Sequence, residues 1–150
     1  MTAPAILLTL NAGSSSVKFA AYDATPDLDW LASGQVEGLG ERARFSVKTA
    51  EPAHANQAPD LDSPTDHHAA VQAILQWLQQ ALAGRPVAAV SHRVVHGGVA
   101  LTDPVRVDDA LLEQLDRLVP LAPLHQPHNL AGIRAAREAF PGMPQIACFD

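Results

Sequence analysis

Residues 11–18 read Asn-Ala-Gly-Ser-Ser-Ser-Val-Lys, and they stand between two short apolar runs, residues 6–10 and 19–22. Both runs have the length and the branched or aromatic residues typical of strands. A cluster of small residues between two such runs favours a hairpin turn. A turn of one glycine and three serines also presents backbone N–H groups and hydroxyls that can converge on a phosphate. The stretch therefore predicts a hairpin whose turn can bind an anion, with Asn11 and Lys18 beside it.

Two better-known phosphate and nucleophile motifs do not fit this stretch. The P-loop pattern G-x-x-x-x-G-K-[ST] is absent, and a strand rather than a helix is expected after the turn. The serines also lack the G-x-S-x-G frame of a nucleophile elbow. An ordinary serine-rich β-turn without a ligand remains the alternative at this point.

The composition of the chain is that of a globular protein. Of its 150 residues, 47% are hydrophobic and 17% are charged, and the net charge is −6. The absence of a long basic cluster argues against nucleic acid as a partner. The first apolar run is too short for a signal peptide or a membrane span. The single cysteine, Cys148, excludes an internal disulfide and fits a reducing cytoplasm; its apolar neighbours predict a buried structural thiol.

Hydrophobic periodicity predicts an α/β fold with antiparallel strands first and β-α units afterwards. A helix is expected to begin at a Ser63 cap, with Pro64 in its first position, and a second at an Asp108 cap. Pro120, Pro123 and Pro127 predict an extended, non-helical connection over residues 121–126. The remaining expected elements are strands at 29–37, 44–48, 87–95 and 145–150, and a helix at 128–140. The nearly continuous apolar start of the 87–95 strand predicts that it is buried on both faces. A chain ending on a core strand suggests a fragment.

Polar residues gather at the carboxyl ends of the predicted strands, where ligands collect in open α/β sheets. Besides the serine turn, these are Arg93 with its neighbouring histidines, His125 with His128, and Asp150. Each of them alone is also compatible with a structural role. Together they indicate anion handling, with the serines and Lys18 for one phosphate and Arg93 for a second anion. Asp150 would then be a metal or proton partner.

The histidines allow a rival interpretation as a zinc site. His92 and His96 have the spacing of the H-E-x-x-H motif, and His125 and His128 could complete a ligand set. However, Arg93 stands where a metalloprotease needs its glutamate. The segment is also strand-like, which would separate residues four apart by about 13 Å. The zinc interpretation is therefore the weaker one.

Three blocks of the sequence resemble the acetate kinases, the acetate/propionate kinase family. They are residues 11–18 above, Ser-His-Arg-Val-Val-His-Gly-Gly at 91–98, and Leu-Ala-Pro-Leu-His-Gln-Pro-His-Asn at 121–129. The final Cys-Phe-Asp looks like the start of that family's next motif. The resemblance implies a ribonuclease H-like mixed sheet with flanking helices, as in the sugar kinase, heat-shock 70 and actin superfamily. Residues 1–150 would be the first, incomplete domain of two, and the second would supply the adenosine site.

The resemblance also implies roles for individual residues of the nucleotide site. Asn11, Ser14, Ser16 and Lys18 would belong to the nucleotide-phosphate loop. Asp150 corresponds to a catalytic aspartate. With Asn11 it would be associated with the metal ion, Mg²⁺ or Mn²⁺.

The acetate side of the site follows from the other two blocks. Arg93 would bind the substrate carboxylate and the phosphoryl group in transfer. Val95 and Leu124 look like walls of a small pocket for the substrate's methyl group, and His125 would position the substrate. His128 departs from the family pattern, which has proline there, and this puts the local loop geometry in doubt.

The implied reaction is reversible phosphoryl transfer from ATP to acetate, giving ADP and acetyl phosphate. The 150-residue chain alone is expected to be inactive, because half of the cleft would be missing, and the intact protein is expected to be a cytoplasmic homodimer. A propionate or butyrate kinase is the alternative within the family, because one methylene is worth only about 1–3 kcal/mol in such a pocket. A non-catalytic phosphate- or nucleotide-binding module is the alternative from another class.

Overall fold

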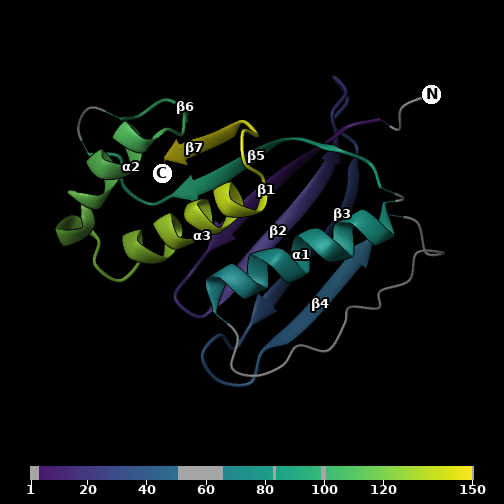
Figure 1. Ribbon diagram of the computed structural model, residues 1–150, viewed down its shortest axis with the longest axis horizontal. Coiled ribbons are helices and arrows are strands. Elements are labelled where there is room, and N and C mark those ends of the chain that lie inside the picture. The colour runs from purple at the N-terminus through teal and green to yellow at the C-terminus, as the bar shows by residue number, and fades with distance from the viewer. Residues whose placement is uncertain (1–3, 51–65, 83, 99–100, 150) are drawn as a thin grey trace.

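The computed structural model describes residues 4–50, 66–82, 84–98 and 101–149. Within them, seven strands form one mixed sheet in the order β4-β3-β2-β1-β5-β7-β6 (Figure 1). The first four strands are an antiparallel meander, β5 and β7 run parallel to β1, and β6 pairs antiparallel with β7. The strands are β1 (Ile6–Ala12), β2 (Ser16–Asp23), β3 (Trp30–Glu37), β4 (Arg44–Thr49), β5 (Val87–Val94), β6 (Val105–Arg106) and β7 (Gln145–Phe149). The predicted mixed α/β sheet is confirmed.

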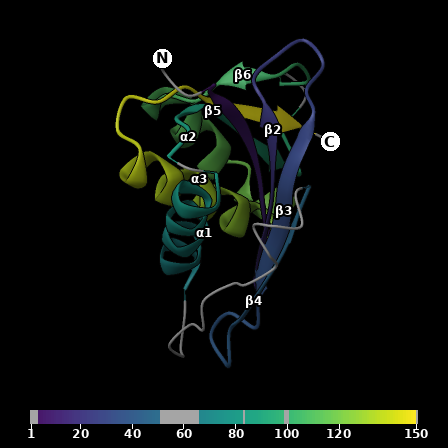
Figure 2. The same cartoon turned by 90° about the vertical axis from the view of Figure 1, so that its right-hand side faces the viewer.

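Three α-helices, α1 (His67–Ala81), α2 (Asp109–Asp116) and α3 (Gln126–Ala139), lie on one face of this sheet (Figure 2). Alternate residues of β1, such as Leu8 and Leu10, turn toward the helices and are buried. Helix α1 packs the expected stripe of Ile74, Leu75 and Leu78 against them, because these residues recur at helical spacing. The core therefore sits between the helices and one face of the sheet.

The opposite face of the sheet is open within the described residues. Strand β5 shows this most clearly, because Val90, His92 and Val94 are buried on the helix side. The residues that alternate with them on the other face are half-buried or exposed: Ala89, Ser91 and Arg93. The expectation that this strand is buried on both faces is therefore wrong for this part of the chain. Its apolar start indicated a doubly covered strand, but small residues such as alanine are tolerated on an exposed face.

Several boundaries differ from the sequence-based expectations. Helix α1 is capped by Asp66, whose carboxylate accepts a hydrogen bond of 2.8 Å from the N–H of Ala69, and not by Ser63, which lies outside the described residues with Pro64. The 121–126 connection is not extended: a 3₁₀ turn, η2 (Val119–Leu121), leads through further turns directly into α3 at Gln126. The Asp108 cap of α2 is confirmed, with its carboxylate 2.7 Å from the N–H of Leu111.

No helix among the described residues is long and apolar enough to cross a membrane.

Candidate functional site

The hairpin between β1 and β2 is held by hydrogen bonds to its carbonyl oxygens. The N–H of Gly13 donates to the carbonyl of Ser16 at 2.8 Å, and the N–H of Leu39 donates to the carbonyl of Ser15 at 3.0 Å. The Gly13 carbonyl lies 2.6 Å from Nε2 of His67, which must therefore donate. With these oxygens engaged, fewer negative dipoles compete with an anion at the turn. Ser14 is exposed at its tip.

Side chains of four expected site residues share the open face of the sheet. Asn11 and Lys18 are direct partners in the β1–β2 ladder, so their side chains point to the same side. Strand β5 is in register with β1 at the pair Leu10 and His92, and the next residue of each strand, Asn11 and Arg93, turns to the opposite, open face. Ser16 alternates with the buried Val17 and faces the same way as Lys18. The fold thus brings together two cations, an amide and a hydroxyl from three neighbouring strands.

Two helices begin at this edge of the sheet. His67 is the first residue of α1 and contacts the hairpin, while α3 begins at Gln126 beside the carboxyl ends of β1 and β5 (Figure 1). His125, which precedes α3, makes no side-chain cap to it. The N-terminal end of a helix carries a partial positive charge and donor N–H groups, which favour an anion nearby. The edge is therefore electropositive from its backbone as well as from Lys18 and Arg93.

The expected substrate-pocket residues lie around the same edge but do not form a closed pocket with one another. Val95 directly follows β5 and is half-buried. Leu124 is 74% exposed, and His125 is exposed beside it in the turn before α3. Leu124 is thus an apolar side chain facing solvent in this part of the chain, and its place as a pocket wall stays a prediction.

The histidines divide between core and surface positions. His92 is buried, and its Nε2 lies 2.6 Å from Oε1 of Gln145; burial lowers its pKa to about 4. Nδ1 of His96 accepts a hydrogen bond of 2.8 Å from the N–H of Gly98. His128 stacks on His67 with ring centroids 5.2 Å apart, and its pKa is lowered by partial burial and then by the neighbouring His67 and His125. In the described ranges no three His, Cys, Asp or Glu residues cluster as metal ligands.

Two further expectations concern the last strand. Cys148 is half-buried rather than fully buried, with its Sγ 3.3 Å from Oγ of Ser91. It lies beside Arg93 in the β5–β7 register, on the open face of the sheet. Asp150 lies outside the described residues, so its assignment as a metal-associated catalytic residue stays a prediction.

Sequence reasoning missed two residues that shape this edge. Asn129, on α3, is 4% exposed; it donates to the carbonyl of Ala12 at 2.7 Å and accepts from the N–H of Val95 at 2.9 Å. His67 holds the hairpin, as described above. A signal for Asn129 exists, because it falls on the same helical stripe as the buried Ile133 and Ala136. A polar residue on an apolar stripe has to find a buried partner.

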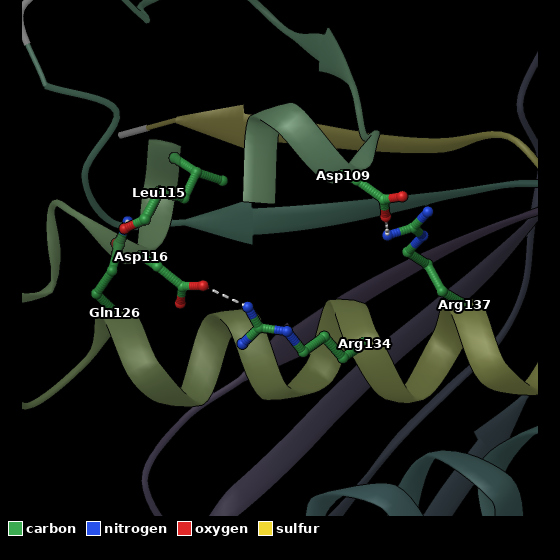
Figure 3. A network of polar contacts seen from close by, with 6 residues as sticks. All are labelled: Asp109, Leu115, Asp116, Gln126, Arg134 and Arg137. Atoms are coloured by element: carbon green, nitrogen blue, oxygen red, sulfur yellow. Dashed lines mark hydrogen bonds and ion pairs between the residues drawn. The ribbon is translucent and has the colours of Figure 1, made fainter. Parts of the chain in front are cut away.

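A groove of about 850 Å³ lies elsewhere, among residues of α2, α3 and the segment leading into β7. Its charges neutralise one another: Arg134 pairs with Asp116 at 2.6 Å, and Arg137 with Asp109 at 2.9 Å (Figure 3). These pairs are largely solvent-exposed, so each is worth at most about 1 kcal/mol. None of the expected site residues lines this groove. It therefore adds nothing to the candidate site.

The fold and this edge define an α/β domain with cationic and polar side chains gathered at the carboxyl ends of its central strands. Comparison with known proteins identifies its family. The model of the acetokinase family matches residues 6–150, and the chain belongs to that family.

Relatives and solved structures agree with this membership. The chain is 44% identical to the acetate kinase of Methylocella silvestris over 154 aligned positions, and 42% identical to that of Streptomyces avermitilis over 151. These alignments cover 96% and 98% of the chain but only 38% and 36% of the relatives. The crystal structure of Porphyromonas gingivalis acetate kinase has a TM-score of 0.85 at 33% identity, covering 97% of this chain and 37% of that one. A propionate kinase from Francisella tularensis has a TM-score of 0.84 at 30% identity, with the same coverage. The ribonuclease H-like fold class is thereby confirmed, and the chain spans less than two-fifths of the length of these proteins.

Proposed function

We propose that residues 1–150 are the first domain of an acetate kinase, which transfers a phosphoryl group reversibly between ATP and acetate. The observation that carries the proposal is the meeting of the β1–β2 hairpin and Arg93 on one face of neighbouring strands, in a chain of the acetokinase family. The hairpin supplies donors for one anion and Arg93 a cation for a second. Two anions held side by side are the reactants that this transfer needs.

This reaction requires the protein mainly to position the two reactants and to stabilise the negative charge of the transition state. A carboxylate is already deprotonated at neutral pH, so no general base is required to make it a nucleophile. Catalysis then consists of holding donor phosphate and acceptor in line and neutralising charge on the moving phosphoryl group. The residue types at the edge, which are amide, hydroxyl, Lys and Arg, suit that task.

Each part of the edge has a distinct role in the proposal. Asn11, Ser14, Ser16 and Lys18 bind the nucleotide phosphates. Arg93 binds the carboxylate and the transferring group, because its planar guanidinium donates two parallel hydrogen bonds to such anions. His125 orients the acetate.

A magnesium ion is part of the proposal, with manganese as a substitute. When bound, it would neutralise charge that develops on the nucleotide phosphates. Mg²⁺ prefers oxygen ligands and takes only one or two carboxylates besides phosphates and water. The side-chain oxygen of Asn11, at the end of β1, suits it, and Asp150 would supply the carboxylate. Because phosphates and water fill most of the coordination sphere, a protein cage of several acidic residues is not required.

Acetate is the proposed substrate, with Val95 and Leu124 beside its methyl group. The relatives named above at more than 40% identity are acetate kinases, which supports acetate over propionate. The preference is expected to be modest, because one methylene changes binding by about 1–3 kcal/mol. We further propose that a second domain of the whole protein supplies the adenosine site, and that the protein works as a homodimer in the cytoplasm.

A hydroxamate assay for acetyl phosphate on the protein in its full natural length tests the proposal. With ATP, Mg²⁺ and acetate, we expect acetate-dependent product, less product with propionate, and none with residues 1–150 alone. An intact-mass measurement on the same sample establishes which length was assayed. A full-length protein without activity on acetate, propionate or butyrate would refute the proposed function.

A further inference from the structure

The side chain of Asn129 bridges the two strand ends that carry the site. Its Nδ2 donates to the carbonyl of Ala12, at the end of β1, over 2.7 Å. Its Oδ1 accepts from the N–H of Val95, just after β5, over 2.9 Å. The residue is 4% exposed and lies in the first turn of α3. One amide therefore joins the hairpin, the segment after Arg93, and a helix.

This bridge begins where the backbone pairing of the strands ends. The last parallel pair of β1 and β5 is Leu10 with His92, and Ala12 and Val95 lie beyond it. A carbonyl of one strand and an N–H of the other thus find their partners in a side-chain amide rather than in each other. An amide has one acceptor and a donor group in a fixed plane, as a peptide unit has. Asn129 acts as a spacer peptide between two strands that have begun to separate.

We infer that Asn129 is a positioning residue that sets the distance between the phosphate-binding hairpin and the Arg93–Val95 segment. The inference rests on the proposed function. The ends of β1 and β5 carry the residues proposed for the two reactants, and in-line transfer depends on their separation. A misplacement of about 1 Å costs on the order of 100-fold in rate. Each reactant alone would still find its own binding groups.

The expected signature is a loss of turnover without a matching loss of binding. In the full-length protein, Asn129→Leu should lower kcat by about 10- to 100-fold while KM for ATP and for acetate change less than about 3-fold. Asn129→Asp keeps the acceptor for Val95 but places an oxygen against the Ala12 carbonyl, and it should lower kcat in the same way. Hydrogen exchange of the Val95 N–H should speed up in Asn129→Leu and stay slow in Asn129→Asp.

Gln145→Leu is the matched control. Gln145 is also a buried amide, 3% exposed, and it hydrogen-bonds His92 in the core, on the face of the sheet opposite to Arg93. Its variant should lose stability yet keep kcat within about 2-fold of the parent protein.

The outcomes separate this inference from the proposed function. If the parent protein makes no acetyl phosphate, the proposed function fails and the inference falls with it. If the parent is active and folded Asn129 variants keep kcat within 2-fold, the inference alone is wrong. A fall in kcat matched by Gln145→Leu, or a rise in KM equal to the fall in kcat, also overturns it. So does failure of both Asn129 variants to fold while Gln145→Leu folds, because the amide then serves stability rather than spacing.

Discussion

His92 on β5 and Gln145 on β7 form a buried pair, with Nε2 of the imidazole 2.6 Å from Oε1 of the amide. Burial lowers the pKa of His92 from 6.5 to about 4, and the hydrogen bond that His92 donates to Oε1 of Gln145 opposes this only in part. Between these two values the unfolded chain binds a proton that the folded chain does not. The free energy of unfolding should therefore fall as the pH falls from 6.5 to 4, by up to about 3 kcal/mol from this residue.

Urea unfolding at several pH values checks this prediction. His92→Gln removes the titrating group and keeps a polar partner for Gln145, so its free energy of unfolding should depend less on pH in that window. Equal slopes for the parent protein and His92→Gln would show that His92 is not the group responsible.

Arg93 is exposed at the carboxyl end of β5, on the same face as Asn11 and Lys18. Arg93→Ala in the full-length protein should lower kcat/KM for acetate by several hundred-fold, since one electrostatic donor at a transition state is worth roughly 3–4 kcal/mol. Arg93→Lys should recover only part of the loss, because an ammonium cannot make the planar two-point contact. Turnover within a few-fold of the parent in Arg93→Ala would remove Arg93 from the reaction.

His67 joins α1 to the hairpin through the carbonyl of Gly13 and stacks on His128. His67→Phe keeps an aromatic ring for the stack but loses the donor. A single hydrogen bond contributes about 1 kcal/mol, so KM for ATP should rise about 5-fold while KM for acetate changes little. Steady-state kinetics with each substrate varied in turn distinguishes this from a general loss of structure, which would affect both.

Gly132 lies on α3 where this helix packs against β1. A Cβ at this position would stand 2.7 Å from Cβ of Ala12, an atom that no side-chain rotation can move. Gly132→Ala would normally stabilise a helix by about 0.5–1 kcal/mol, but overpacking here should outweigh that and destabilise the protein by about 1–3 kcal/mol. Thermal unfolding measures the sign of this change in stability. A raised melting temperature of Gly132→Ala would mean that α3 shifts away from β1 without losing stability, and it would contradict the prediction.

The sequence allowed much of the fold to be predicted where local chemistry decides it. The Gly-Ser hairpin, the Asp108 cap and the stripe of α1 depend on neighbouring residues, and the structure agrees with them. Strand β6 was missed because two residues cannot display an alternating pattern. The extended connection was wrong for a specific reason. A proline φ near −65° also suits the first turn of a helix. Pro120 is the second residue of η2, and Pro127 is the second residue of α3.

Residue types and the family resemblance predicted the residues of the site. They did not predict the hydrogen bonds that hold these residues in place. Asn11, Lys18 and Arg93 were expected at strand ends, and register brings them to one face. The partners of Asn129 are 117 and 34 positions away in the chain. No local pattern specifies which buried amide meets which carbonyl, because that depends on how helices and strands pack.

The strand order also determines when the central strand becomes protected. Strand β1 pairs with β2 through a short turn, but its other neighbour, β5, ends only at Val94. At synthesis rates of 5–20 residues per second, roughly 4–16 s pass between the synthesis of the end of β1 and that of the end of β5. During that interval β1 is an open edge with a row of unpaired backbone groups, which is a template for pairing with other chains. The nascent chain is therefore most prone to aggregate before residue 94 emerges, and chaperone capture should be strongest then.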